Sequence, residues 1–134
     1  AKAPDLDCDS HLIEYLDCSG FTRYALFRAS RGHLIIPDGS AAQAEWARDR
    51  LHRIAHYADA ETYAGKDPGR LFLGHLAAGS IRIGAPGHVW LGRSNGRQVR
   101  TLECYGGAGV GSRPWTHPTL LRHADGAWEI PTLG

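Results

Sequence analysis

The sequence predicts an α+β domain in which N-terminal helices pack on an antiparallel sheet of about five strands. Apolar residues at helical spacing dominate the first half of the chain, whereas short apolar runs between glycines dominate the second half. Helices followed by consecutive strands are typical of an α+β fold. A length of 134 residues suits one domain with its own core. We therefore expect a single domain over residues 1–134.

The composition narrows the classes of function. A hydrophobic fraction of 43% and a charged fraction of 22% are those of an ordinary globular protein. A formal net charge of +1 argues against a nucleic-acid partner. No apolar run approaches the roughly 18 residues of a membrane span.

The predicted helices follow a polar N-terminal arm, residues 1–14. From Ser19 the spacing i, i+3, i+4, i+7 predicts a helix with one face formed by Phe21, Tyr24, Ala25 and Arg28. Ser40 and Gln43 match a capping box, which predicts the start of a second helix. The apolar stripe of that helix comprises Ala47, Leu51, Ile54, Ala55 and Ala58. Residues 40–60 are thus expected to be a helical insertion.

The predicted strands follow Gly65 as short apolar runs bounded by turn residues. They cover residues 70–76, 87–92, 99–105, 119–124 and 127–133. Asn95-Gly96 lies between the second and third runs and predicts a hairpin there. These runs together predict an antiparallel meander.

The three cysteines have different surroundings. A thiol attacks as its thiolate, and its ordinary pKa of about 8.5 falls beside a helix N-terminus or an imidazole. Cys18 lies at the predicted start of the first helix, where Asp17 can cap and the amides of Cys18 and Ser19 can bind an oxyanion. Cys8 lies in a polar segment and Cys104 in mid-strand. Cys18 is therefore the predicted nucleophile, and Cys8 is either an unpaired thiol or paired with Cys104 or, least favoured, with Cys18.

The predicted base is one of eight histidines. His88 begins a strand after a Pro-Gly pair, from which its ring can project into a cleft. If Asn95-Gly96 turns the hairpin, Glu103 on the returning strand comes near His88 and can orient the imidazole. Cys18, His88 and Glu103 thus form a possible triad.

A zinc site is not expected. His52 and His56 have the spacing of a helical zinc pair, but Arg53 stands where the metalloprotease motif has Glu, and no third ligand is evident in the sequence. A solvated helix face is the favoured interpretation.

Five pieces of the chain resemble, in order, the NlpC family of bacterial cell-wall cysteine peptidases, which have a papain-like fold. LDCSGFTRYALF, which contains Cys18, resembles the nucleophile motif of that family. The later pieces are IIPDGSAAQAEW, DPGRLFL, GHVWLGRSNGR and TLECYGGAGVGSRPW. The resemblance carries the base onto His88, and it places Glu103 where the family commonly has histidine.

The resemblance implies a cysteine endopeptidase that hydrolyses stem peptides of peptidoglycan, at the D-Glu–diaminopimelate bond, without metal or cofactor. It also implies peptidoglycan as partner, a secreted, periplasmic or otherwise extracytoplasmic location, and we expect a monomer. Asp17, Arg28 and Trp115 are expected to contact substrate, and Arg31 and Arg113 are further candidates for its carboxylates. If the chain is a toxin rather than a remodelling enzyme or phage lysin, a cognate immunity protein is a further expected partner.

Two alternatives stay open. A CHAP-like N-acetylmuramoyl-L-alanine amidase uses the same cysteine–histidine chemistry. A non-catalytic cell-wall-binding module of the same fold would account for a departure from the family, which carries a tyrosine turn upstream of its cysteine. The residues before Cys18 contain no such turn.

Overall fold

The computed structural model describes residues 17–64, 66–104 and 109–131, and it places them in four helices and a six-stranded antiparallel sheet. The helices are α1 (Cys18–Ala29), α2 (Ser40–Arg50), α3 (Asp59–Ala64) and α4 (Pro118–His123). The strands are β1 (His52–Arg53), β2 (Leu71–Leu76), β3 (His88–Ser94), β4 (Val99–Cys104), β5 (Val110–Gly111) and β6 (Gly126–Ile130). The predicted α+β class is confirmed.

The sheet is a meander with one returning strand. Its order is β1-β6-β2-β3-β4-β5, so β2 to β5 pair in sequence and β6 returns to the other side of β2. All neighbouring strands are antiparallel. The prediction of about five strands falls one short: four predicted runs are β2, β3, β4 and β6, the fifth is a helix, and the two-residue edge strands β1 and β5 were not predicted.

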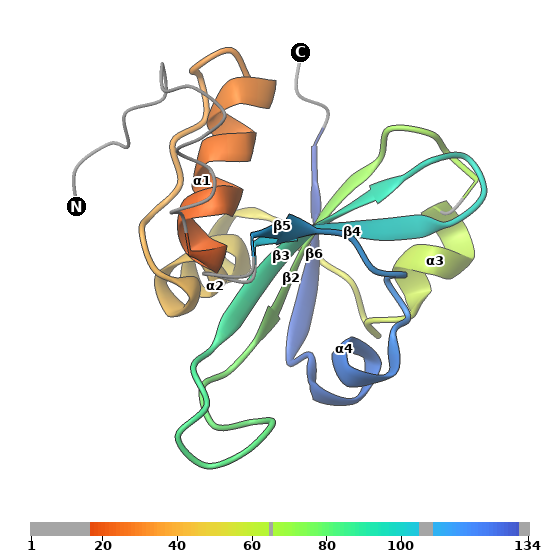
Figure 1. Ribbon diagram of the computed structural model, residues 1–134. Coiled ribbons are helices and arrows are strands. Elements are labelled where there is room, and N and C mark those ends of the chain that lie inside the picture. Colours follow the sequence, from red (N-terminus) through yellow and green to blue (C-terminus); the bar gives the residue numbers. More distant parts are fainter. Residues whose placement is uncertain (1–16, 65, 105–108, 132–134) are drawn as a thin grey trace.

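Helices cover both faces of the sheet (Figure 1). On one face, α1 and α2 pack against a core of Leu26, Ile36, Ala44, Ala47, Leu73, Val89, Leu91, Trp128 and Ile130. On the other face, α3 and α4 pack against a core of Ile54, Ala60, Phe72, Leu76, Trp90, Val99, Trp115, Leu120 and Ala127. Alternate residues of β2 and β3 therefore supply the two cores, as the period of a β-strand requires.

Helix α1 starts where it was predicted to start, but it buries a different face. Phe21 is buried as expected, whereas Tyr24 and Ala25 are half-buried and Arg28 is exposed. The buried residues are Ser19, Phe21, Thr22, Arg23 and Leu26. Arg23 can be buried because its Nε donates to the carbonyl of Ile36 at 2.8 Å.

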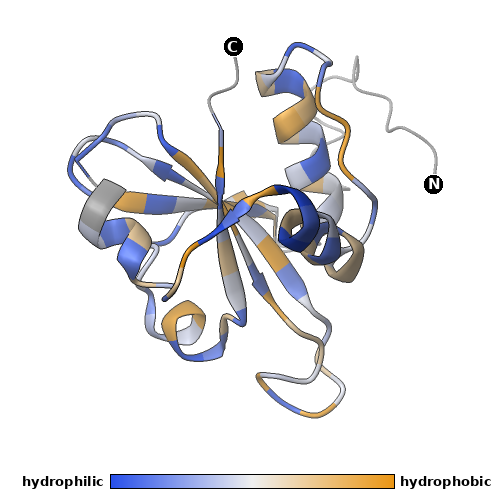
Figure 2. Ribbon diagram, turned by 180° about the vertical axis from the view of Figure 1, so that it is seen from behind, coloured by the Kyte–Doolittle hydropathy of each residue, from blue (hydrophilic) through white to orange (hydrophobic). Residues whose placement is uncertain are grey.

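Helix α2 is shorter than predicted and has no capping box. Its N-cap is Gly39, no side chain caps it, and it ends at Arg50. Figure 2 shows the hydrophilic last turn of α2, after which the chain enters β1. Residues 40–60 therefore hold α2, β1 and the start of α3 rather than one helix.

Gln43 has a different function from the predicted cap. It is fully buried, and its Nε2 donates to the carbonyls of Ser19 (2.8 Å) and Pro37 (3.0 Å). Its Oε1 accepts from the Thr22 hydroxyl at 2.6 Å. Gln43 therefore ties α2 to the first turns of α1, next to Cys18.

The predicted strand over residues 119–124 is wrong, because this segment forms α4. Pro118 occupies the first turn of the helix, where its missing N–H costs nothing. The His117 ring accepts from the Thr119 amide at 3.2 Å and so caps the helix. The apolar pair Leu120-Leu121 was read as strand, but only Leu120 faces the core.

Candidate active site

The start of α1 presents Cys18 on an organised turn. The Asp17 carboxylate accepts from the Gly20 amide at 2.7 Å and from the Ser19 hydroxyl at 3.1 Å. No described residue accepts a hydrogen bond from the amides of Cys18 and Ser19, as is usual in the first turn of a helix. Cys18 is a half-buried free thiol. The positive end of the helix therefore lies at a thiol with open amide donors beside it.

His88 lies opposite this thiol, at the first position of β3. The Sγ of Cys18 lies 4.0 Å from the carbonyl oxygen of Gly87, the residue before His88, and Cys18 is close enough to raise the pKa of His88. The His88 ring also stacks on Trp90, with centroids 5.3 Å apart and planes at 28°. Gly74 makes room for that indole, since a Cβ there would lie 2.4 Å from it. Trp90 thus supports the imidazole from within the core.

Glu103 reaches His88 because of the β3–β4 hairpin. Asn95 begins the turn, with its side-chain oxygen accepting from the amides of Arg97 (2.9 Å) and Gln98 (3.0 Å). Gly96 adopts φ +91°, a conformation that favours glycine. The predicted turn is confirmed, and its register brings Glu103 to the Nε2 of His88 at 2.7 Å.

The Glu103 carboxylate is fully buried and saturated with donors. Arg113 donates from Nε to Oε2 (2.8 Å) and from Nη2 to Oε1 (2.6 Å), and the Thr101 hydroxyl also donates to Oε2. Burial by itself raises the pKa of Glu103, but the hydrogen bonds of Arg113, His88 and Thr101 outweigh it and lower the pKa to about 2. Glu103 is therefore an anion at neutral pH.

His88 is held in its protonated form by its two neighbours. Burial lowers the pKa of His88, but the hydrogen bonds and negative charges of Cys18 and Glu103 outweigh burial and raise it to about 9. Nε2 is bonded to Glu103, so Nδ1 is the ring nitrogen that can face the sulfur. The arrangement therefore favours an imidazolium beside the Cys18 sulfur.

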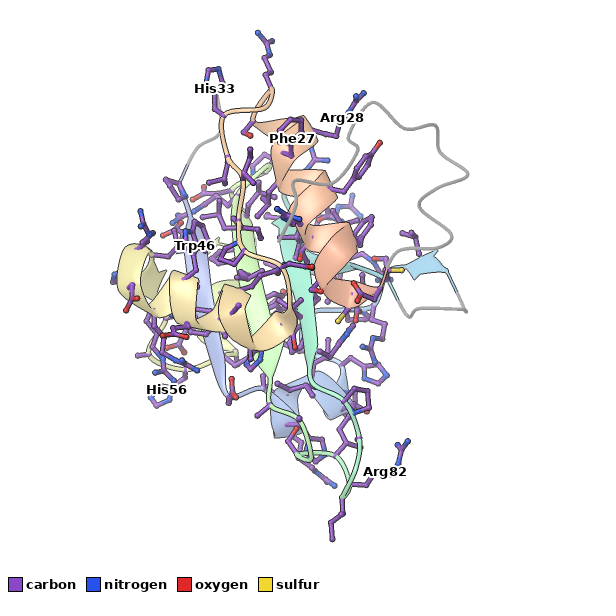
Figure 3. All side chains as sticks on the ribbon, turned by 90° about the vertical axis from the view of Figure 1, so that its left-hand side faces the viewer. Phe27, Arg28, His33, Trp46, His56 and Arg82 are labelled. Carbon is purple, nitrogen blue, oxygen red and sulfur yellow. The ribbon has the colours of Figure 1, made fainter. Side chains whose placement is uncertain are left out.

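A cavity of about 640 Å³ opens onto these groups, here called the Cys18 cavity. Its lining includes Asp17, Cys18, Ser19, His88, Cys104 and Arg113. The connection between β2 and β3 supplies another wall through Ile81, Arg82 and Pro86. Figure 3 shows Arg82 at the outer tip of this connection. A larger cavity, about 940 Å³, lies near the other end of α1 around Ala29 and Arg93, and none of the described residues that line it is a cysteine or histidine.

Two predicted substrate contacts are far from this cavity or closed off from it. Arg28 lies ten residues beyond Cys18 on α1, about 15 Å along the axis, and Figure 3 shows it at the opposite end of the helix. Trp115 is fully buried, stacks on Tyr57 with centroids 4.3 Å apart, and donates from Nε1 to the Tyr57 carbonyl. The prediction that Trp115 stacks on substrate is therefore wrong, because the ring is enclosed in the core. Asp17 does line the cavity, although its carboxylate caps α1.

Sequence reasoning missed the true neighbour of Arg113. The guanidinium was a candidate for substrate carboxylates, but in the structure it is engaged with Glu103. Its position follows from a short antiparallel contact, in which Thr101 N–H donates to the Arg113 carbonyl (2.7 Å) and Arg113 N–H donates to the Thr101 hydroxyl (2.8 Å). The sequence holds no signal for this register, because the contact joins residues twelve positions apart rather than neighbours in the chain.

The remaining candidates lie outside this site. His52 belongs to β1 and His56 follows it, so the helical spacing expected of a zinc pair does not exist. In the described part of the chain, no group of three His, Cys, Asp or Glu side chains is placed to hold a metal ion. Nor does any helix there have the length and apolar character to cross a membrane. Cys8, its predicted pairings and the arm over residues 1–14 lie outside the described residues.

Comparison with known proteins gives no assignment: no family model matches the sequence, and no curated protein matches it significantly.

Proposed function

We propose that the protein is a papain-like cysteine peptidase that hydrolyses amide bonds in the stem peptides of peptidoglycan. The reaction class is supported by the placement of Cys18 and His88 at the wall of one cavity, with the His88 ring hydrogen-bonded to Glu103. The proposed substrate class and the D-Glu–diaminopimelate bond are supported by the resemblance of the LDCSGF and GHV segments to the NlpC family.

The first half-reaction forms a thioester. The Cys18 proton resides on Nδ1 of His88, and the thiolate attacks the scissile carbonyl carbon. The carbonyl oxygen becomes an oxyanion, which the amides of Cys18 and Ser19 can stabilise together with the dipole of α1. When the tetrahedral intermediate collapses, the C–N bond breaks and His88 gives its proton to the leaving amine.

The second half-reaction returns the enzyme to its starting state. A water molecule gives a proton to His88 while its oxygen attacks the thioester carbonyl. The C–S bond then breaks, the product leaves as a carboxylic acid, and the proton on His88 again faces the Cys18 thiolate. Glu103 stays ionised throughout and keeps the ring oriented.

Digestion of purified sacculi tests this proposal. We expect fragments with new diaminopimelate amino ends, identified by mass spectrometry, whereas an amidase would release L-Ala amino ends. Release of no fragments would support a binding module of the same fold. On this proposal the enzyme acts where peptidoglycan lies, outside the cytoplasm, and as a monomer.

Cys18→Ala is expected to reduce cleavage by at least about 10³-fold, because it removes the thiol that attacks the scissile carbonyl in the proposed mechanism. Cys8→Ser is the matched control and is expected to leave cleavage largely intact. Equal loss from the two substitutions would exclude Cys18 as the nucleophile.

A further inference from the structure

Behind the His88–Glu103 contact lies a second charged contact that the mechanism above does not use. Arg113 binds both oxygens of Glu103, at 2.8 and 2.6 Å, in the two-pronged geometry that suits a guanidinium and a carboxylate. Oε1 of Glu103 is shared between Arg113 and His88, and Oε2 between Arg113 and Thr101. The carboxylate can therefore not rotate without breaking several bonds at once.

The main chain holds this guanidinium in place. Arg113 exchanges two hydrogen bonds with Thr101, one through its amide and one through its carbonyl, and Pro114 pairs with Arg100. The side chain of Arg113 is 25% exposed, while that of Glu103 is fully buried. A fixed cation thus lies between the solvent of the Cys18 cavity and a buried anion.

The other charged or titratable groups around this cluster do not replace Arg113. Asp17 and Cys18 lie at the start of α1, and Arg82 lies in the connection before β3. Tyr57 precedes α3, Glu61 lies within it, and Cys104 ends β4. Asp17 caps α1, and the Glu61 carboxylate accepts from the Val99 amide. Tyr57 stays neutral, because burial raises its pKa far above the ordinary value. Arg113 is therefore the cation that neutralises Glu103.

We propose that Arg113 is a positioning residue for the reaction: it holds Glu103 ionised and in one orientation, so that the proton of the pair stays on His88 and Nδ1 stays aimed at Cys18. This inference rests on the proposed function. The thiolate, imidazolium, carboxylate and guanidinium then alternate in sign and sum to zero. Without the guanidinium the cluster carries a net negative charge, and burial favours uptake of a proton by Glu103.

The test replaces Arg113 by Met, which keeps much of the volume, and by Lys, which keeps the charge but not the fork. The matched control is Arg70→Met, since Arg70 also pairs with a carboxylate, that of Glu129, but lies away from the Cys18 cavity. We expect Arg113→Met to lower kcat on peptidoglycan fragments about 10–100-fold with little change in KM. Arg113→Lys should recover part of that loss, and Arg70→Met should leave kcat and KM unchanged.

The pH profile separates positioning from mere stabilisation of the fold. In Arg113→Met, the acid limb of kcat/KM is expected to move upward by about one pH unit or more, because Glu103 then takes a proton at higher pH. A raised KM at unchanged kcat would instead make Arg113 a substrate-binding residue and overturn the inference. A uniform loss with an unshifted profile would likewise overturn it, leaving a structural contribution only.

A substrate-free measurement keeps the inference separate from the proposed function. The rate at which iodoacetamide alkylates Cys18, followed by mass spectrometry of its peptide in a Cys8→Ser background, reports the thiolate at each pH. We expect the pH at which alkylation begins to rise by about one unit in Arg113→Met and by less in Arg113→Lys. If the Met variant fails to fold, the Lys variant still provides the measurement. A shift in the pH of alkylation, in a protein that cleaves no peptidoglycan, would support the inference and reject the proposed function. Cleavage of peptidoglycan without such a shift would support the proposed function and reject the inference.

Discussion

Two histidines on adjacent strands of this sheet each contact a carboxylate at nearly the same distance. His75 on β2 meets Asp125 at 2.8 Å through Nδ1, and His88 on β3 meets Glu103 at 2.7 Å through Nε2. Their strands pair so that His75 lies opposite Val89 and Leu76 lies opposite His88. The two rings therefore leave the sheet on opposite faces, because successive side chains of a strand alternate.

The surroundings of the two pairs differ more than their distances. Asp125 has a side chain 38% exposed, and its amide donates to the His75 carbonyl at 2.9 Å, so this pair fastens the α4–β6 connection onto β2. Glu103 is fully buried and accepts hydrogen bonds from Arg113 and Thr101 as well, and its partner His88 lines a cavity together with the Cys18 thiol. A histidine–carboxylate contact thus indicates a site only when the second ring nitrogen faces a reactive group.

The largest expected difference between the pairs follows from removing each ring. His88→Ala should lower cleavage of peptidoglycan fragments by at least about 10³-fold, since it removes both the proton acceptor and the proton donor. His75→Ala should leave kcat/KM within about threefold, and lower the free energy of unfolding by about 1–3 kcal/mol through the lost contact with Asp125. Steady-state kinetics and urea denaturation of both variants measure the two effects. A comparable loss of activity in both variants would show that the two pairs do not differ in function.

A smaller contrast is expected from neutralising each carboxylate. Glu103→Gln should reduce kcat/KM about 10²-fold, because the amide can no longer stabilise the imidazolium and leaves Arg113 without its counter-charge. Asp125→Asn keeps an acceptor in a partly exposed place and should change kcat/KM by less than about twofold. Steady-state kinetics at pH 7 decides between these outcomes. If Glu103→Gln proves as active as wild type, orientation of His88 by a charged partner is not required.

The smallest effect is expected from pH alone, and it concerns only the His88 pair. Because the pKa of His88 is raised to about 9, activity should fall about tenfold between pH 8 and pH 10 as the imidazolium is lost. The same raised pKa stabilises the fold fully below His88's ordinary pKa of about 6.5, and this contribution disappears as pH rises through 9. The stability gap between wild type and His88→Gln should therefore narrow in urea titrations at pH 10. A gap equal at pH 6 and pH 10 would contradict the raised pKa.

Glu103 behaves in the opposite sense. Its pKa is lowered from 4.5 to about 2, so its contribution to stability is complete above its ordinary pKa and lost as pH falls toward 2. Acid denaturation of wild type and Glu103→Gln should accordingly converge at the lowest pH values. This change at low pH does not affect the prediction for His88, which concerns pH values above 8.

The sequence by itself determined the parts that depend on residues a few positions apart. Asp17, Cys18 and the capped start of α1 were predictable because a cap and its helix are neighbours in the chain. The approach of Glu103 to His88 was predictable because the Asn95-Gly96 turn sets the register of a hairpin. These local rules brought together the three residues of the candidate triad.

Only the tertiary structure decided the rest. The segment 119–124 became a helix, and residues 40–60 became α2, β1 and the start of α3, because packing on the sheet outweighed a local apolar pattern. Trp115 was enclosed by its contact with Tyr57, and Arg113 was directed to Glu103 by its antiparallel contact with Thr101. What an arginine or a tryptophan does depends on which group the fold brings beside it, and that is a property of the packed chain.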